Sequence, residues 1–520
     1  MSMALDSALT IAASGVAATQ AQLAVLSNNI ANAGVTGYTA KTLDATSFVA
    51  GAANDGVSIG NIARSVNLAV QQSLYSTNSN VAALTVQTQV LQAINNVQGV
   101  PGAGSDLSGS LTALQDSFTN LLVNPASASD QSAAVSAASG LATSINNMAD
   151  VITTQANSVQ SQIVTTVAAV NSALQTTNQL TKEIMAATAA GQSTATLSDQ
   201  RDAAMQTISG ALNVHYVEQP NGNLTILGQD GFSLPLTATL ATSSATLSAN
   251  STYSAVSGGI PPITLSSGNP NVPPTDVTEK LSGGTLGELV SLRDSTLPGY
   301  TAQLDEFSQK LASRFQQQGL TLFTTASGTV PAATTPPALP GDVGFSSAIQ
   351  VNPTVLAAPN LVRDGTNAVP ASATQAGFAV NNTASGGTAG FSTLISNVLT
   401  YSLGTNVGPT TANAPFATTG LGPLGTLSTP FTSPTTLGAY ANLIVAGQSA
   451  DTANANAALT SSQAYQTTLS GLISGQSGVN VDQQMGLMIQ LQNSYQDNAR
   501  IMQATQTMFT ALMTDLNSSS

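Results

Sequence analysis

The sequence offers few residues that could carry out chemistry. His215 is the only histidine, and it stands in an alternating apolar stretch that predicts a strand, with no serine or carboxylate placed to act with it. Asp305 and Glu306 are adjacent on a predicted helix, where consecutive side chains point in different directions and cannot share one substrate. We therefore expect an ordinary strand position at His215 and a solvated helix face at the two carboxylates.

Other kinds of site are no better supported. Gly283 and Gly284 are not followed by the Lys-Ser/Thr pair that a phosphate-binding loop requires. Cysteine is absent, which excludes disulfides and thiolate metal sites, and no other spacing resembles a metal site. Asp199, Arg201 and Asp202 read as a surface ion-pair cluster at the start of a helix. We expect no catalytic residue, no cofactor and no metal, and hence no enzyme.

The composition limits the classes of partner that the chain can bind. Charged residues make up 7% of the 520 residues, and the formal net charge is -14, so the chain lacks the basic surface that nucleic acids or anionic membranes require. Most of the polarity comes from uncharged side chains, which predicts a largely neutral surface. At ~150 residues per domain, the length suggests roughly three or four domains. Nucleic acid is therefore not expected as a partner.

The apolar N-terminal stretch resembles neither a signal peptide nor a membrane span. A signal peptide begins with basic residues, whereas Asp6 is the only charged residue before Lys41. No run reaches the ~18 consecutive apolar residues that span a bilayer. We expect no cleaved signal peptide and no membrane insertion.

The same stretch has the clearest helical pattern in the chain. Its apolar residues recur in alternating steps of four and three, which is a heptad repeat, and they predict a helix from about Asp6 to Asn32, ~40 Å long at 1.5 Å per residue. Such a stripe needs a facing helix, because water cannot satisfy its apolar side chains. The stripe consists of Leu5, Leu9, Ala12, Val16, Thr19, Leu23, Leu26 and Ile30.

The C-terminal segment repeats this period from Asp482 to Leu516, with Asp482 at the expected N-cap. We expect the two terminal helices to pair as a coiled coil; the open alternative is that both are core helices of an ordinary bundle. Their outer faces carry almost no charge, which favours helices surrounded by neighbouring copies of the chain. The second stripe consists of Met488, Leu491, Tyr495, Asn498, Met502, Thr505, Phe509, Leu512 and Leu516.

Between the ends, the chain is predicted to be mainly helical with inserted β domains. A very long apolar stripe from Leu141 to Ile184 predicts a long helix, and Asn221-Gly222 between alternating runs predicts a β-hairpin. The Gly-, Pro- and Thr-rich stretch 324–434 fits a second insertion better than a disordered loop. The expected parts are a terminal helical domain (1–60 and 475–520), a helical bundle (61–212, 282–323 and 435–474), a β-rich insertion (213–281) and a second β-containing or loop-rich insertion (324–434).

Short motifs then give a resemblance. The N-terminal motif is residues 27–32, which precede the Gly37-Tyr38 pair, and the C-terminal motif contains Asn480 and Asp482. Together they resemble the signatures shared by the axial proteins of the bacterial flagellum, which are the rod, hook and junction subunits. The blocks 197–202, 283–289, 297–300 and 345–353 resemble the hook-associated (hook–filament junction) members. Lys41 and Gln484 lie where this chain departs from the usual motifs. The signature residues are Ser27, Asn28, Asn29, Ile30, Ala31, Asn32, Gly37, Tyr38, Asn480 and Asp482.

The resemblance implies a structural subunit of the junction, exported to the cell exterior without a cleaved signal peptide. Its implied partners are the hook protein, the next junction protein on the filament side, copies of itself in a ring or helical layer, and an export chaperone at 488–516. The ends are then expected to be disordered or loosely paired in the free chain. Burial stabilises by ~0.8 kcal/mol per CH₂ group, and this gain has to offset the ~1–2 kcal/mol of backbone entropy lost for each residue that becomes ordered. The alternatives are a hook or distal-rod subunit and a secreted adhesin-like surface protein.

Overall fold

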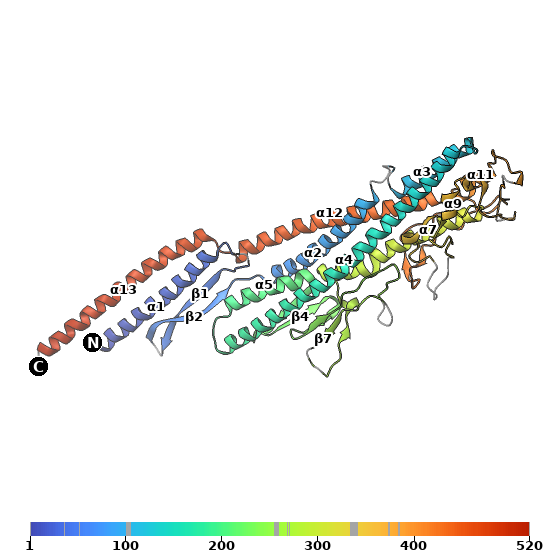
Figure 1. Ribbon diagram of the computed structural model, residues 1–520. Helices are drawn as coiled ribbons and strands as arrows, with labels where there is room; N and C mark the ends of the chain where they lie inside the picture. Colours follow the sequence, from blue (N-terminus) through green and yellow to red (C-terminus); the bar gives the residue numbers. More distant parts are fainter. Residues whose placement is uncertain are drawn as a thin grey trace.

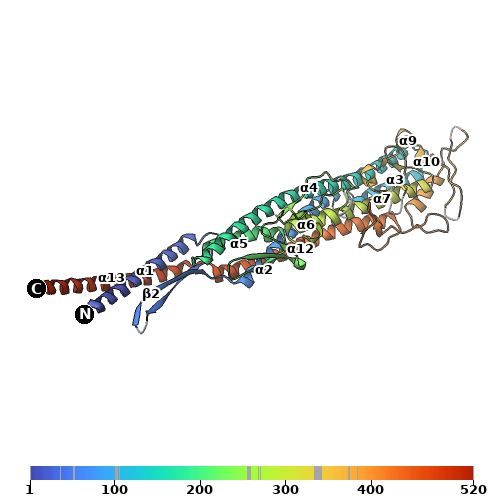
Figure 2. The same ribbon diagram turned by 90° about the horizontal axis from the view of Figure 1, so that it is seen from below.

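The computed structural model describes residues 2–518 apart from 36, 51–52, 100–103, 105, 254–258, 268, 270, 333–341, 373–374 and 383–384. The molecule is elongated and mainly helical, with small sheets along one side (Figure 1). Both termini lie together at one tip, and the short elements that follow residue 323 lie at the opposite end (Figures 1 and 2). The prediction of a mainly helical chain with small β parts is confirmed.

A bundle of long helices forms the middle of the molecule and is built around α4 (Ala128–Ala189). The Ser127 side chain caps α4 by accepting a hydrogen bond from the backbone N–H of Asp130, and apolar residues at helical spacing are buried along the whole length of the helix. The helix ends just before Gly191, whose φ is 67°. The remaining helices of the bundle are α2 (Leu68–Gln98), α3 (Leu107–Val123), α5 (Ala195–Ala211), α6 (Gly284–Ser291), the π-helix η3 (Leu292–Thr296), α7 (Leu297–Gln317) and α12 (Leu437–Ser477).

Helix α12 pairs with α2 along much of its length. On the half of α12 nearer the termini, Ala455 and Leu469 are buried, but Tyr465 and Leu472 are 55% and 46% exposed. Tyr465 and Leu472 therefore do not pack inside the bundle. This half of α12 lies mainly against α2 alone, and a single neighbouring helix covers only one stripe.

Two three-stranded antiparallel sheets pack on the bundle, the first against α2 and α5 and the second against α4. The turn of the predicted hairpin contains Gly222, whose φ is 85°, and His215 is exposed on the first strand. Asn171 of α4 donates to the carbonyl of Leu240 and accepts from its N–H, which attaches the second sheet to the helix. The strands are β3 (Val214–Glu218), β4 (Leu224–Gly228) and β5 (Ser233–Leu234) in one sheet, followed by β6 (Thr239–Ala241), β7 (Thr264–Ser266) and β8 (Thr275–Asp276) in the other; the 3-10 turns are η1 (Gln229–Gly231) and η2 (Thr278–Lys280).

The end of the molecule away from the termini consists of short elements around a small apolar core. Phe345, Ile349 and Leu394 are buried there, whereas Val380 is 42% exposed. The elements are β9 (Phe323–Thr324), α8 (Phe345–Ala348), β10 (Gln350–Val351), α9 (Pro353–Ala357), α10 (Leu361–Asp364), α11 (Thr393–Asn397), the π-helix η5 (Val398–Ser402), β11 (Thr419–Leu421) and β12 (Leu427–Ser428).

These short elements fold back over α7, and for this reason the expectation of solvated carboxylates on α7 is wrong. Asp305 and Glu306 are only 3% and 4% exposed. Asp305 accepts hydrogen bonds from the N–H of Gly344 (2.8 Å), the N–H of Ser346 (2.9 Å) and the Ser346 hydroxyl (2.6 Å). Burial raises the pKa of Asp305 to about 6, although these hydrogen bonds act in the opposite direction.

The terminal part contains α1 (Ser2–Asn32), a long hairpin of β1 (Lys41–Ala50) and β2 (Ala53–Arg64), and α13 (Val481–Ser518). The hairpin pairs Lys41 with Arg64 at its base and lies along α1. The backbone N–H of Val57 donates to the Ser14 hydroxyl across this contact. An isolated two-stranded hairpin is marginal in water, so its packing on α1 is what stabilises it. The sequence analysis did not predict this hairpin.

Among the described residues, one helix is long and apolar enough to cross a bilayer, namely α1 over Leu5–Asn32. A helix that packs against other protein helices satisfies the same test, and 22% of this stretch is already buried within the single chain. Most of its other apolar side chains are half-buried in the monomer.

Candidate assembly interface

Helices α1 and α13 pack side by side in opposite directions (Figure 1). Asn29 of α1 contacts Gln484 at the start of α13, and Gln20 reaches Tyr495 one third of the way along it. A Cβ atom at Gly15 would lie 3.1 Å from the Asn498 side chain. Near the tip, Leu5 and Leu9 of α1 line a shallow cleft with Thr505 and Phe509 of α13. The contacts thus step backward along α13 as they advance along α1.

The predicted stripes face each other, but most of their side chains are only half-buried. Ala12, Thr19 and Thr505 are buried, and Phe509 is 45% exposed at the open tip of the pair. Two helices alone leave the flanks of each stripe in solvent. The half-buried members are Leu5, Leu9, Val16, Leu23, Leu26, Ile30, Met488, Leu491, Tyr495, Asn498, Met502 and Leu512, and the side chain of Leu516 lies outside the described residues.

The sequence analysis did not predict the burial of three residues of α1, namely Ala18, Val25 and the signature residue Asn29. They are buried because α1 has two neighbours, with α13 on one side and the β1–β2 hairpin on another. Apolar alternation within 41–64 would have been the signal for the hairpin, but polar and glycine residues interrupt it.

A second apolar row runs along α13 beside its stripe. Leu487, Ile501 and Met508 are 41%, 52% and 55% exposed, and they are separated by multiples of seven residues, so they lie on one line of the helix. We call these three residues the α13 flank. Other exposed apolar side chains of this helix are Val481, Met485, Ile489 and Met513.

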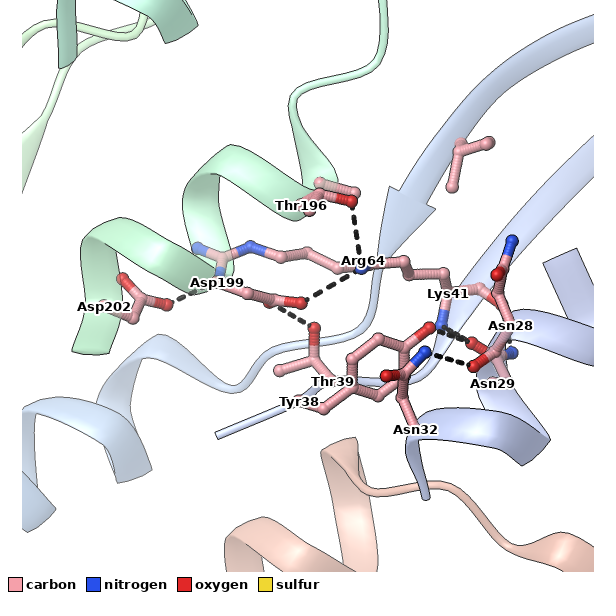
Figure 3. Close-up of polar contacts among 12 residues, drawn as sticks. Asn28, Asn29, Asn32, Tyr38, Thr39, Lys41, Arg64, Thr196, Asp199 and Asp202 are labelled. Atoms are coloured by element: carbon pink, nitrogen blue, oxygen red, sulfur yellow. Dashed lines mark hydrogen bonds and ion pairs between the residues drawn. The ribbon is translucent and has the colours of Figure 1, made fainter. Parts of the chain in front are cut away.

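Asn29 is the centre of the N-terminal signature (Figure 3). Its side chain is fully buried, and its Oδ1 accepts hydrogen bonds from the Tyr38 hydroxyl (2.9 Å) and the Lys41 N–H (3.1 Å). Its Nδ2 donates to the Lys41 carbonyl (2.8 Å) and to Gln484 Oε1 (3.0 Å). One amide therefore joins α1, the base of the hairpin and the start of α13.

The other signature residues have supporting or surface positions. Gly37, with a φ of 83°, permits the turn that brings Tyr38 back to α1. Asn28 and Asn32 line a cleft of about 550 Å³ between α1 and α5, and the Asn32 Nδ2 donates a hydrogen bond to the Asn28 carbonyl. Ile30 is half-buried, and Ser27 and Ala31 are exposed.

The predicted N-cap of α13 is shifted by two residues. The helix begins at Val481, and the Asn480 Oδ1 accepts a hydrogen bond from the N–H of Gln483 (3.1 Å), so Asn480 caps it in place of Asp482. Asp482 is exposed in the first turn, where its charge still favours the positive end of the helix dipole.

A cluster of charged residues lies where the hairpin meets α5 (Figure 3). Asp199 accepts a hydrogen bond from the Thr39 hydroxyl (2.6 Å) and lies 3.3 Å from both Lys41 Nζ and Arg64 Nη1. Arg64 Nη1 also forms a short ion pair with Asp202. Burial lowers the pKa of Arg64, but the two aspartates outweigh it, so the pKa is raised overall. We call Lys41, Arg64, Asp199 and Asp202 the ionic joint.

This cluster was expected on the surface, and that expectation is wrong. Asp202 is 8% exposed, and Arg201 is fully buried, where its Nη2 lies 2.7 Å from Glu218 and its Nη1 donates to the Gly222 carbonyl. The unpredicted hairpin covers one side of the start of α5, and the β3–β4 hairpin covers the other. Among the described residues, no group of three or more acidic or histidine side chains has a spacing that could hold a metal ion.

Comparisons with known proteins agree with the division between ends and middle. Residues 91–329 match the family described as the flagellar hook-associated protein FlgK helical domain. Residues 9–39 match the flagella basal body rod protein family, and residues 474–515 match the flagellar basal body rod FlgEFG protein C-terminal family. The matched ends contain most of α1 and of α13.

Two curated relatives are the flagellar hook-associated protein 1 of Salmonella typhimurium and that of Salmonella typhi. Each is 26% identical over 322 residues, which cover 60% of this chain and 56% of the relative. The chain thus aligns with just over half the length of these relatives. The solved structure of the flagellar hook junction protein FlgK from Burkholderia pseudomallei is 25% identical over 51% of this chain and 47% of that chain, with a TM-score of 0.41.

A hook-associated helical domain therefore lies between two ends of the rod-protein type, in the same order as the motifs along the sequence. Residues 91–329 are thus similar to the flagellar hook-associated proteins, and the two ends are similar to flagellar rod proteins.

Proposed function

We propose that this chain is a structural subunit of the bacterial flagellum, located at the junction between hook and filament. The observation that carries the proposal is the match of residues 91–329 to the hook-associated helical domain, flanked by ends of the rod-protein type. The subunit has no catalytic task in this proposal. Its role is to provide a wall segment that adapts one polymer to the next.

The terminal helices are proposed to build the inner wall. Within one chain, α1 and α13 would pair as a coiled coil through their heptad stripes, and the uncovered faces would contact neighbouring copies in a ring or helical layer. Support comes from the opposed stripes, the exposed α13 flank and the scarcity of charge: α1 contains Asp6 as its only charged residue. A neutral apolar face can be buried against a neighbour without the cost of desolvating charges.

The proposed partners above and below the layer are the hook protein and the next junction protein on the filament side. Before assembly, the exposed apolar residues of α13 would bind an export chaperone, because they are the largest uncovered apolar row at this end. Export is proposed to proceed without a cleaved signal peptide, which places the chain outside the cell in the flagellum.

The ends are proposed to be loosely paired in the free chain. Most stripe residues remain half-buried, so each ordered residue gains little burial to offset its lost backbone entropy. The end of α1 that carries the N-terminal signature should be the most stable part, because Asn29 joins three elements there. Amide hydrogen exchange on the free chain tests this: fast exchange over residues 6–24 is expected, and slow exchange throughout residues 6–30 contradicts it.

The proposed domains keep the predicted division: terminal domain 1–60 with 475–520, helical bundle 61–212, 282–323 and 435–474, and insertions 213–281 and 324–434. Limited proteolysis should cut first in the long loops of the insertions and near the two chain crossings between the terminal part and the bundle.

Electron microscopy of a strain lacking this chain tests the function. Hooks without filaments, with filament protein released into the medium, are expected for a junction subunit. Missing hooks would favour the hook or distal-rod alternative, which the matches at the two ends also fit. Intact flagella with a lost surface adhesion would favour the adhesin-like alternative.

A further inference from the structure

The ionic joint lies at the place where the terminal part meets the bundle. Here Ala40 donates to the carbonyl of Ser477, and Asn67 donates to Gln476, so the segment before β1 and the two chain crossings, after β2 and before α13, come together. The direction of the terminal part relative to the bundle is set at this place (Figures 1 and 2).

The contacts that cross from the hairpin base to α5 are strongly polar. Lys41 reaches Asp199 and the Thr196 hydroxyl, and Arg64 bridges Asp199 and Asp202. These four charged side chains are only 10–13% exposed, and they balance as two positive and two negative charges. Lys41 and Arg64 are also the only basic residues before Lys182, so the scarce positive charge of this region is concentrated at one contact.

The space beside the joint is open. The cleft of about 550 Å³ lies against Lys41 and Asp199 and separates the end of α1 from the start of α5, with Tyr38 and Thr196 on its walls. Large apolar side chains do not fill this gap, so side-chain hydrogen bonds and ion pairs carry much of the connection. Contacts of this kind depend on geometry and can be released, whereas a packed apolar interface would make the two parts one rigid unit.

We propose that the ionic joint is an electrostatic clamp that fixes the angle between the terminal part and the helical bundle, and that releasing it lets the two parts pivot about the two chain crossings. Asn29 lies on the terminal side of the pivot and keeps α1, the hairpin and α13 together while they move. This inference concerns the single chain and does not rest on the proposed function.

The test measures one distance across the pivot. The chain has no cysteine, so spin labels can be placed at Ser58→Cys, exposed on β2, and Gln175→Cys, exposed on α4, without removing native thiols. Pulsed electron paramagnetic resonance then gives the distance distribution in the full-length chain. A single narrow peak is expected for the labelled parent, and a broad distribution for Asp199→Asn combined with Asp202→Asn.

Controls separate the clamp from general damage. Asp497→Asn removes an exposed carboxylate near Arg500 on α13 and should keep the narrow peak. Arg64→Gln, which removes the ion pairs with both aspartates, should also broaden the peak. Far-UV circular dichroism should be unchanged in all variants. A parent distribution as broad as that of the double asparagine variant, or an unchanged peak in that variant or in Arg64→Gln, would each overturn the proposal.

Discussion

The Asn29 side chain of α1 donates a hydrogen bond to Gln484 Oε1 of α13 over 3.0 Å, linking two residues 455 positions apart. The same amide accepts hydrogen bonds from Tyr38 and Lys41, so this residue of the N-terminal signature makes contacts within the single chain. It holds the two terminal helices and the hairpin in register at the place where the apolar stripe between the helices begins.

Replacement of Asn29 by alanine should therefore destabilise the terminal part. Four hydrogen bonds are lost and buried partners are left unsatisfied, for an expected cost of about 1–3 kcal/mol in the free energy of unfolding. Hydrogen exchange over 25–41 and 481–490 measures it locally. Asn28→Ala, at the exposed neighbouring position, is the matched control and should change exchange little. Equal effects of the two substitutions would contradict the central position of Asn29.

The α13 flank should matter for assembly but not for the single chain. Changing Ile501 and Met508 to glutamine removes two apolar side chains that are more than half exposed, so the monomer's unfolding free energy should shift by less than about 0.5 kcal/mol. If neighbouring copies bury both, assembly should weaken by about 3 kcal/mol, roughly a hundredfold.

The measurement is the amount of this chain retained in purified flagella, with motility as a second readout. Val123→Gln, on a side chain that is 86% exposed at the end of α3, is the control and should be retained normally. Normal retention of the double glutamine variant would show that the flank is not an assembly contact.

Asp305 should give the unfolding free energy a distinctive pH dependence. Its pKa is raised to about 6 in the folded chain by burial, above its usual 3.8, so between these values the folded state binds more protons than the unfolded state. Its contribution is therefore most favourable at low pH and is lost as the pH rises from about 4 toward 7.

The comparison variant is Asp305→Asn, which cannot ionise. The difference in unfolding free energy between parent and variant, measured by guanidinium unfolding at several pH values, should change by about 3 kcal/mol across that range, in the sense of parent stability falling with pH. Carboxylates such as Glu306, whose pKa burial also raises, act in both proteins and largely cancel. A constant difference, or one of opposite sign, would contradict the assigned burial of charge.

The sequence could predict the parts whose pattern repeats. Heptad spacing located α1 and α13, a long apolar stripe located α4, and Asn221-Gly222 located the β3–β4 turn, because each depends on local geometry alone. Phe509 keeps the heptad phase yet stays exposed, since it lies at the open tip where the facing helix is about to end.

What the sequence could not predict depends on contacts between distant segments. The β1–β2 hairpin is stabilised by α1, and its Ser-, Gly- and Asn-containing strands lack a clear alternation. Without it, the burial of Val25 and Asn29 could not be foreseen, nor could the pairing of Arg64 with Asp199 and Asp202 from a segment more than a hundred residues away. The burial of Asp305 likewise depends on the later loop at Ser346.

The most direct test of the account places α1 and α13 beside each other in the assembled flagellum. A Cβ atom at Gly15 would lie against the Asn498 side chain, so Gly15→Cys and Asn498→Cys introduce two thiols within reach of each other in a chain without native cysteine. Mild oxidation of purified flagella should then give an intrachain disulfide at high yield, with little or none when Leu487→Cys replaces Asn498→Cys. No intrachain disulfide in flagella that contain the doubly substituted chain would contradict the account.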